Sequence, residues 1–297
     1  MNTATTLELR EARFRIGANG VAEFSHQRPE ARNALSMAMR EDYQDMLERI
    51  ENDRTIRALV ITGSGGSFCA GGDVKGMAAM QAGASEEALS GQCRSRISAD
   101  HHRWLDRLRS LDVPVVAAVD GPAYGAGASI ALMADFVLAS ARASFCMVFA
   151  RMGMVPDFGA FHTLPRLVGL AKAKELMLTA RRVGAEEARD LGIAYAVHAP
   201  EQLLDEAHRL AARLANGPRD AMGMIKNSLN RSFDCDYRTM AEIEGHQQAV
   251  AMSLPYHADA VGRFLGKQPL AYDWDRPPGR EAYPPSSVEA TSFNALR

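Results

Sequence analysis

Two glycine-rich stretches of the chain each have the composition of a backbone anion site. They are SFCAGGDVK at residues 67–75 and GPAYGAGASIALMAD at 121–135, and each follows an apolar run typical of a β-strand. A strand that enters a glycine-rich turn and then a helix leaves N–H groups unpaired at the first helical turn, where the dipole favours negative charge. Two such turns facing each other would form an oxyanion hole from backbone alone. The alternative is that the glycines only form tight turns.

The second stretch departs from two other glycine motifs. In a GxGxxG dinucleotide fingerprint the third glycine would fall at Ile130, and the following apolar run FVLAS does not end in the acidic residue that contacts a ribose. A serine nucleophile at Ser129 would lack the second glycine of its elbow. These departures argue against a dinucleotide site and against a serine hydrolase.

Apolar periodicity predicts an α/β chain that must position these turns. Two short strands are expected around Asn19-Gly20, followed by a helix capped by Ser36. Strands are then predicted at 57–62, 115–119, 136–139, 144–148 and 194–197, and helices at 85–111, 160–168, 171–179, 185–191, 201–216, 218–231, 236–253 and 256–265.

Composition narrows the class of protein. The 297 residues carry a formal net charge of −2, which indicates neither a nucleic-acid partner nor an anionic membrane surface. No apolar run reaches the length of a membrane span, and the N-terminal residues lack the pattern of a signal peptide. The four cysteines show no CxxC spacing and are expected to be reduced thiols. A cytoplasmic protein is the expectation.

Several motifs in the same order resemble the crotonase (enoyl-CoA hydratase/isomerase) superfamily over about residues 12–269. They are RPEARNALS at 28–36, FCAGGDVK at 68–75, VDGPAYGAGASIALMAD at 119–135, GMVPDFG at 153–159, LPRLVG at 164–169, LTARRVGAEEARDLGIAYAV at 178–197 and AVGRFLGKQP at 260–269. The resemblance implies a ββα spiral core over 1–197 and a helical module over 198–267 that packs subunits into trimers, or into hexamers of two trimers. Residues 268–297 are expected to be an extended or partly disordered tail.

The resemblance also implies a site for an acyl-CoA thioester, with coenzyme A as part of the substrate, no tightly bound cofactor and no metal. The N–H groups of Gly72 and Ala126 correspond to the oxyanion-hole donors, while Gly71, Gly125 and Gly127 would let the backbone approach the thioester. The substrate-binding positions are Arg28, Ala31, Ala70, Gly71, Asp73, Lys75, Gly125, Phe149, Phe158 and Lys267.

Two positions depart from the hydratases of this superfamily. Hydratases carry a pair of glutamates that activate water, and the corresponding residues here are Ser129 and Phe149. Serine is no base near neutral pH and phenylalanine has no proton to exchange, so two-glutamate hydration is disfavoured.

One carboxylate does occur in a family motif, at Asp157 in MVPDFGA. The chain most resembles the ring-epoxide isomerases of phenylacetyl-CoA catabolism, through GAGAS and the segment before Pro156. A single carboxylate beside an oxyanion hole suffices for a 1,3-proton shift, since it can remove the α-proton and return it at the γ-carbon. The alternative is that Asp157 caps the helix that begins near Gly159.

These features predict an acyl-CoA isomerase with Asp157 as the proton carrier. Phe149, Phe158 and Phe161 favour a bulky, cyclic or aromatic acyl group if they line the acyl pocket. The alternatives are an atypical hydratase, an Asp157-dependent hydrolytic or dehalogenating enzyme, and a catalytically silent acyl-CoA-binding scaffold. Dehalogenation would need a further base; Asp106 stands at that position, with His102 one turn earlier.

Overall fold

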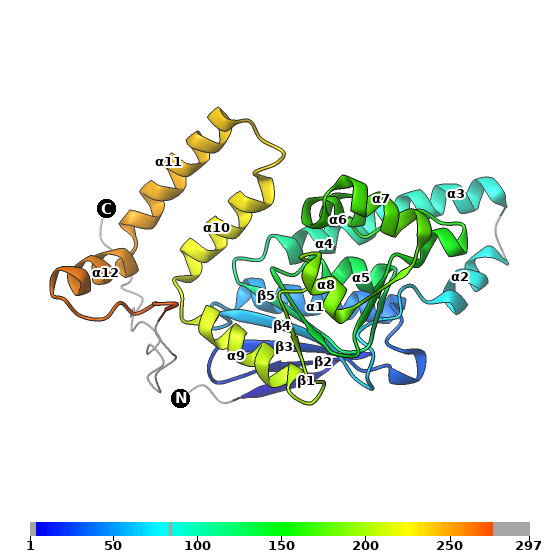
Figure 1. Ribbon diagram of the computed structural model, residues 1–297, viewed down its shortest axis with the longest axis horizontal. Helices are drawn as coiled ribbons and strands as arrows, with labels where there is room; N and C mark the ends of the chain where they lie inside the picture. The colour runs from blue at the N-terminus through cyan, green and yellow to red at the C-terminus, as the bar shows by residue number, and fades with distance from the viewer. Residues whose placement is uncertain (1–3, 83–84, 276–297) are drawn as a thin grey trace, which may run out of the picture.

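Seven strands form the central sheet of the protein (Figure 1). The computed structural model describes residues 4–82 and 85–275. The first three strands pair antiparallel and the others parallel, in the order β1-β2-β3-β4-β5-β7-β10. The strands are β1 (Thr5–Glu8), β2 (Ala12–Ile16), β3 (Val21–His26), β4 (Ala58–Gly63), β5 (Val115–Val119), β7 (Phe136–Ser140) and β10 (Ala196–His198).

Both faces of this sheet are buried, which explains why β4 and β5 are continuous apolar runs. Leu59 and Ile61 of β4 face the main core, while Ala58 and Val60 face a second cluster. Helix α9 (Leu203–Ala215) covers that second cluster with an apolar stripe that includes Leu210. A strand covered on both sides has no polar face and therefore no alternation.

A smaller sheet carries the second glycine-rich stretch. It has the order β6-β8-β9, with β6 (Pro122–Tyr124) parallel to β8 (Ser144–Cys146) and β8 antiparallel to β9 (Arg182–Gly184). β6 leads directly into α5 (Ala126–Ala131). The short helix is completely buried, so its position is fixed from all sides.

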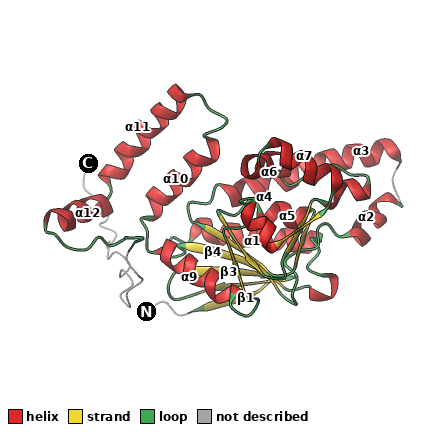
Figure 2. Ribbon diagram, in the orientation of Figure 1, coloured by secondary structure: helices red, strands yellow, loops and turns green. Residues whose placement is uncertain are grey.

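Helices surround the strands on their outer sides (Figure 2). The remaining helical segments are η1 (Pro29–Ala31), α1 (Met37–Asn52), α2 (Val74–Gln81), α3 (Glu86–Ser95), η2 (Arg96–His101), α4 (His102–Arg109), η3 (Val148–Met152), α6 (Ala160–Val168), α7 (Leu170–Thr179), α8 (Ala185–Asp190), α10 (Arg219–Arg231), α11 (Tyr237–Ser253) and α12 (Pro255–Leu265). Ser36 caps α1, because its hydroxyl accepts a hydrogen bond from the N–H of Met39 at 3.1 Å.

The last three helices extend away from the sheet (Figure 1). Lys226 of α10 anchors them to the core, since its ammonium lies 2.8 Å from the carboxylate of Asp135 and 3.1 Å from the carbonyl oxygen of Val113. No residue of α11 or α12 is buried. After α12 the chain returns to α9, where the Trp274 ring lies 3.9 Å from the guanidinium of Arg213. The remainder of the predicted tail, residues 276–297, lies outside the described residues.

The predicted α/β class is confirmed, with three local differences. The predicted helix over 85–111 is divided into α3, a π-helical turn η2 and α4. The predicted strand over 144–148 ends at Cys146 and is followed by the 3₁₀-helix η3, and strands β1, β6 and β9 were not predicted. The domain boundaries at 197 and 267 stay predictions. Across the described residues, no helix is both long and apolar enough to cross a membrane.

Candidate active site

The two glycine-rich stretches lie side by side. Cys69 and Ala123 form a parallel bridge between them. The N–H groups of Phe68 and Cys69 both donate to the carbonyl oxygen of Pro122 at 3.1 Å, and the N–H of Tyr124 donates to the carbonyl oxygen of Cys69 at 3.0 Å. These bonds fix the distance between two backbone segments that are about fifty residues apart in the sequence.

Glycine is required where the segments approach each other. Gly71 has a φ of +103°, and a Cβ there would lie 2.9 Å from the carbonyl oxygen of Tyr124. A Cβ at Gly127 would overlap the carbonyl group of Cys69. These glycines were predicted to let the backbone approach a thioester, but the atoms nearest to them belong to the facing backbone segment. Their first role is therefore to let the two segments pack together.

The amides of Gly72 and Ala126 lie beside this junction. Within the described residues, neither donates its N–H to another backbone group. A Cβ at Gly71 would lie only 3.8 Å from the nitrogen of Ala126, so the donor segments are close. Ala126 is the first residue of α5, and its N-cap residue Gly125 offers no side-chain acceptor. Two open backbone donors of this kind can polarise a carbonyl oxygen; their convergence on one point stays a prediction.

The first glycine-rich turn differs in one respect from the expectation. Helix α2 begins at Val74, so the N–H of Gly72 precedes the helix rather than belonging to its first turn. The carboxylate of Asp73 caps that turn, accepting hydrogen bonds from the N–H of Lys75 at 3.0 Å and of Gly76 at 3.3 Å. Asp73 therefore caps the N-terminal amides of α2, where the helix dipole acts. The N–H of Gly72 lies before that turn, so its direction depends on the local peptide geometry alone.

Asp157 lies in the loop between η3 and α6. Phe158 and Gly159 both adopt left-handed backbone conformations, with φ of +52° and +74°. Gly159 is the N-cap residue of α6, and no side chain caps that helix. The Asp157 carboxylate is therefore not a helix cap. Its Oδ1 is buried and has no hydrogen-bond partner among the described residues.

The surroundings of Asp157 perturb its protonation. Burial raises the pKa of the Asp157 carboxyl to about 6, and the positive charge of Arg40 partly opposes this rise. Arg40 belongs to α1 and donates a hydrogen bond to Nε2 of the buried His101 at 2.6 Å. A carboxyl with this pKa can both take up and release a proton near neutral pH.

Arg40 and His101 were missed by the sequence analysis. The sequence does indicate weakly that Arg40 lies near the core, because it stands between Met39 and Tyr43, which are both buried positions of α1. No pattern in the sequence singled out His101, which contacts the ring of Phe158 with ring centroids 4.6 Å apart. The described residues contain no cluster of three or more potential metal ligands.

The two positions predicted to replace the hydratase glutamates lie close to the second turn. Ser129 is buried, and its hydroxyl donates to the carbonyl oxygen of Gly125 at 3.2 Å. Phe149 is buried, and a Cβ at Gly125 would lie 3.7 Å from its Cζ. Neither side chain can take a proton from water.

The other predicted aromatic residues do not share one environment. Phe158 packs into the core, where its ring also meets the edge of Trp104 at 5.9 Å between centroids. Phe161 lies on the surface of α6 with 60% of its side chain exposed. Of these three phenylalanines, Phe149 is therefore the one that lies beside Gly125 of the second turn.

Most predicted coenzyme A positions lie around the first turn. The guanidinium of Arg28 lies 2.8 Å from the Asp73 carboxylate, and Ala31 ends the adjacent η1. Ala70 is half-buried and Lys75 is exposed. Lys267 follows α12 in the extended C-terminal part. The structure thus brings the predicted positions together with the exception of Lys267.

The two candidates for a further base, Asp106 and His102, and the additional histidine His162 have other surroundings. The ring of His162 accepts a hydrogen bond from Arg109 at 3.0 Å, and burial together with the charge of Arg109 lowers its pKa. Asp106 is exposed on α4, and His102 is half-buried at the start of that helix. None of the three is hydrogen-bonded to Asp157.

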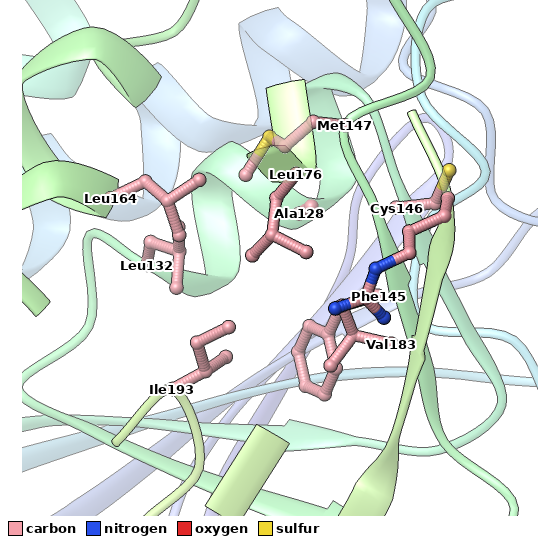
Figure 3. A pocket seen from close by; sticks show the side chains of 10 residues that line it. Ala128, Leu132, Phe145, Cys146, Met147, Leu164, Leu176, Val183 and Ile193 are labelled. Carbon is pink, nitrogen blue, oxygen red and sulfur yellow. The ribbon is translucent and has the colours of Figure 1, made fainter. Parts of the chain in front are cut away.

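A small apolar pocket, about 20 Å³ in volume, lies between α5, β8, α6, α7 and β9 (Figure 3). Its lining residues are Ala128, Leu132, Phe145, Cys146, Met147, Leu164, Leu176, Arg181, Val183 and Ile193. No predicted site residue lines it. A space of this size holds no more than a water molecule, so it is not the acyl site.

Comparison with known proteins gives matches over most of the chain. The family described as enoyl-CoA hydratase/isomerase matches residues 17–272. A 1,2-epoxyphenylacetyl-CoA isomerase of Escherichia coli (strain K12) is 34% identical over 249 residues, which cover 84% of this chain and 93% of that protein. A short-chain-enoyl-CoA hydratase of Clostridium acetobutylicum is 32% identical over 251 residues, with coverage of 84% and 93%. The crystal structure of an enoyl-CoA hydratase/isomerase from Cupriavidus metallidurans CH34 superposes with a TM-score of 0.83 at 37% identity, covering 90% of this chain and 97% of that chain.

The buried carboxylate makes a prediction about stability. Because the folded-state pKa of Asp157 lies above its ordinary value of 3.8, the unfolded state releases this proton first as the pH rises. The wild-type protein should therefore lose on the order of 3 kcal/mol of stability from this group between about pH 4 and pH 6. Asp157→Asn stays neutral and should gain stability relative to wild type over that interval, measured by urea unfolding.

The matched control is Asp106→Asn, which removes an exposed carboxylate from α4. This variant keeps Asp157, so it should lose stability over the same interval as wild type does. Parallel pH dependences of wild type and Asp157→Asn would show that Asp157 is not the buried titrating group.

Proposed function

The chain belongs to the enoyl-CoA hydratase/isomerase (crotonase) family, and from that premise we propose that it catalyses a 1,3-proton shift on an acyl-CoA thioester. Members of the family act on CoA thioesters, but relatives named isomerase and hydratase are about equally similar to this chain. The choice between the reactions therefore depends on the side chains of this site.

The Asp157 carboxylate is the observation that carries the proposal. It is half-buried, its buried Oδ1 has no hydrogen-bond partner among the described residues, and its pKa is raised to about 6. Ser129 and Phe149 replace the paired acids that hydration would use. One carboxylate that exchanges a proton near neutral pH supports proton transfer better than it supports addition of water.

The proposed mechanism needs one proton carrier and one anion site. The thioester carbonyl oxygen accepts hydrogen bonds from the N–H groups of Gly72 and Ala126, which stabilise an enolate by several kcal/mol, each donor contributing on the order of 3 kcal/mol. Asp157 removes the α-proton of a β,γ-unsaturated acyl group, and the electron pair delocalises onto the carbonyl oxygen. The same carboxyl returns the proton at the γ-carbon, which leaves the α,β-isomer. The reaction moves only a proton, so it requires no redox cofactor and no metal.

Substrate binding is assigned to the residues around the first turn. Arg28, Ala31 and Lys75 would hold the coenzyme A moiety, with Ala70, Gly71 and Asp73 shaping the turn. Asp73 and Arg28 form an ion pair at 2.8 Å, which orients the guanidinium at the edge of the site. Phe149 beside Gly125 favours a cyclic or aromatic acyl group, whereas Phe158 supports the loop from the core.

Three other functions remain as outcomes of experiment. An atypical hydratase would add water with Asp157 as its one acid. A hydrolytic or dehalogenating enzyme would use Asp157 as nucleophile and would need a second base. A silent scaffold would bind CoA thioesters without turnover across a broad panel.

The carboxylate can be tested by substitution. Asp157→Asn should reduce turnover at least ~100-fold, a typical contribution of general acid–base catalysis, because the amide cannot carry the proton. The dissociation constant of a CoA thioester, measured by titration calorimetry, should stay nearly unchanged. Asp106→Asn is the control and should keep wild-type turnover. Full activity of Asp157→Asn would contradict the assigned role.

The product distinguishes isomerisation from hydration. A β,γ-unsaturated acyl-CoA, best with a cyclic or aromatic group, should be converted to its α,β-isomer without a change in mass. In deuterium oxide the substrate should exchange hydrogen at the α- or γ-carbon, since the carboxyl equilibrates with solvent. Efficient gain of one water by a 2-enoyl-CoA, seen by mass spectrometry, would make hydration the principal reaction.

The C-terminal helices support an oligomer. α11 and α12 bury no residue within the chain, and Leu229, Met252, Phe264 and Leu265 leave more than half of their side chains exposed. We expect sedimentation at micromolar concentration to give a mass three or six times that of the 32.3 kDa subunit. Such an assembly could bring Lys267 to the coenzyme A of a neighbouring subunit. A monomer would remove that contribution.

A further inference from the structure

His26 is a buried histidine that the proposed mechanism does not use. It ends β3, and only 1% of its side chain is exposed. The rings of Phe24, Tyr43 and Phe68 surround it, with centroids 5.5–5.7 Å from its own. Placing a polar ring among apolar ones is costly unless its polar atoms are hydrogen-bonded.

Both ring nitrogens of His26 do have partners. Nδ1 lies 2.8 Å from the carbonyl oxygen of Phe68, and Nε2 lies 2.8 Å from the hydroxyl of Tyr43. A carbonyl oxygen only accepts, so Nδ1 carries the proton. Nε2 of the neutral ring then accepts the hydroxyl proton of Tyr43. Burial lowers the pKa of His26 to about 4, which keeps the ring in this neutral form.

The carbonyl that His26 holds belongs to the segment of the first glycine-rich turn. The preceding carbonyl, that of Ser67, accepts a hydrogen bond from Nδ2 of Asn33 at 2.6 Å. The following one, that of Cys69, accepts the N–H of Tyr124 at 3.0 Å. His26 thus fixes the middle of three consecutive peptide carbonyls, four residues before Gly72.

We propose that His26 is a positioning residue that holds the backbone segment carrying the Gly72 N–H in register for a thioester carbonyl. The Phe68 carbonyl fixes the His26 tautomer, and the Tyr43 hydroxyl only provides the second ring nitrogen with a partner. This inference rests on the proposed thioester site but not on the particular reaction that follows. Without the Nδ1 donor, the Phe68 carbonyl would be buried and unbonded, and the peptide could rotate to find another partner. A small displacement of an oxyanion-hole donor is enough to lower catalysis strongly.

Tyr43 also connects His26 to the loop that carries Asp157. Its ring stacks on Trp104 at 4.7 Å between centroids, and Trp104 in turn contacts the ring of Phe158 at 5.9 Å. Phe158 follows Asp157 directly in the chain. One buried stack of side chains therefore supports both the proposed donor segment and the proposed acid.

A pair of amide substitutions separates the two hydrogen bonds of His26. The amide nitrogen of asparagine can take the place of Nδ1 and keep the bond to Phe68, whereas the glutamine amide reaches the place of Nε2 and loses that bond. His26→Asn leaves the Tyr43 hydroxyl without its acceptor, so it is combined with Tyr43→Phe. Tyr43→Phe alone and Ile50→Val, a buried change on the same helix, are the controls.

The direct measurement is the infrared stretch of the thioester carbonyl in bound cinnamoyl-CoA labelled with carbon-13 at that carbonyl. Donors in register shift this stretch to lower frequency whichever reaction follows. We expect the shift to persist in wild type, both controls and the His26→Asn/Tyr43→Phe variant, and to be largely lost in His26→Gln. In His26→Gln, kcat should fall ~100-fold with KM little changed. Thermal unfolding verifies that each variant is folded.

The inference is overturned if His26→Gln keeps both the shift and kcat. It is also overturned if the folded His26→Asn/Tyr43→Phe variant loses the shift. If His26→Gln does not fold, this second criterion alone decides. A wild-type protein without any shift would remove the thioester site and the inference together. Asp157→Asn should keep the shift while losing turnover. The carbonyl shift therefore tests the His26 inference, whereas turnover and the product test the isomerase proposal.

Discussion

Lateral pairing of the two glycine-containing segments is the constraint on which the site depends. Backbone hydrogen bonds hold residues 67–72 beside residues 122–127, so the free amides of Gly72 and Ala126 come from adjacent chains. At Gly71 and Gly127 a side chain would meet backbone atoms of the facing segment, which cannot turn aside as a flexible side chain can. The sheet beneath fixes the segments, because β4 and β5, from which they emerge, are neighbours.

The Asp157 loop, by contrast, contains features that lower the stability of the fold. Its carboxylate has one buried oxygen, Oδ1, without a hydrogen bond among the described residues. The next residue, Phe158, adopts a left-handed conformation that costs a non-glycine residue on the order of 1 kcal/mol. The ring of Phe158 offsets this cost by packing against His101 and Trp104. Unfavourable features that persist at one place, supported by the core around them, are typical of functional sites.

Sequence patterns predicted the class of fold, most helices after residue 160 and the pairing of the two turns, because each depends on local periodicity or on a motif of consecutive residues. They did not predict that Asp73 would occupy the first turn of α2, since a cap and a substrate contact use the same residue type. The neighbours of Asp157 were also missed. The charge of Arg40 acts on Asp157 from α1, and His101 contacts Arg40 and the next residue, Phe158, from η2; no spacing rule links residues 40, 101 and 157.

The division between backbone and side-chain groups explains how one fold can serve different reactions. An anion site made of peptide N–H groups persists under substitution of most surrounding side chains, provided that the glycines allow the segments to meet. Proton carriers, by contrast, are side chains at a few positions. Here Ser129 and Phe149 stand at two predicted positions and cannot act as bases, whereas Asp157 has a carboxyl. Replacing an acid by serine or phenylalanine leaves the fold and the anion site in place but removes a proton carrier. Under the proposed function, the reaction of this chain would follow from the carboxyl that Asp157 keeps among these positions.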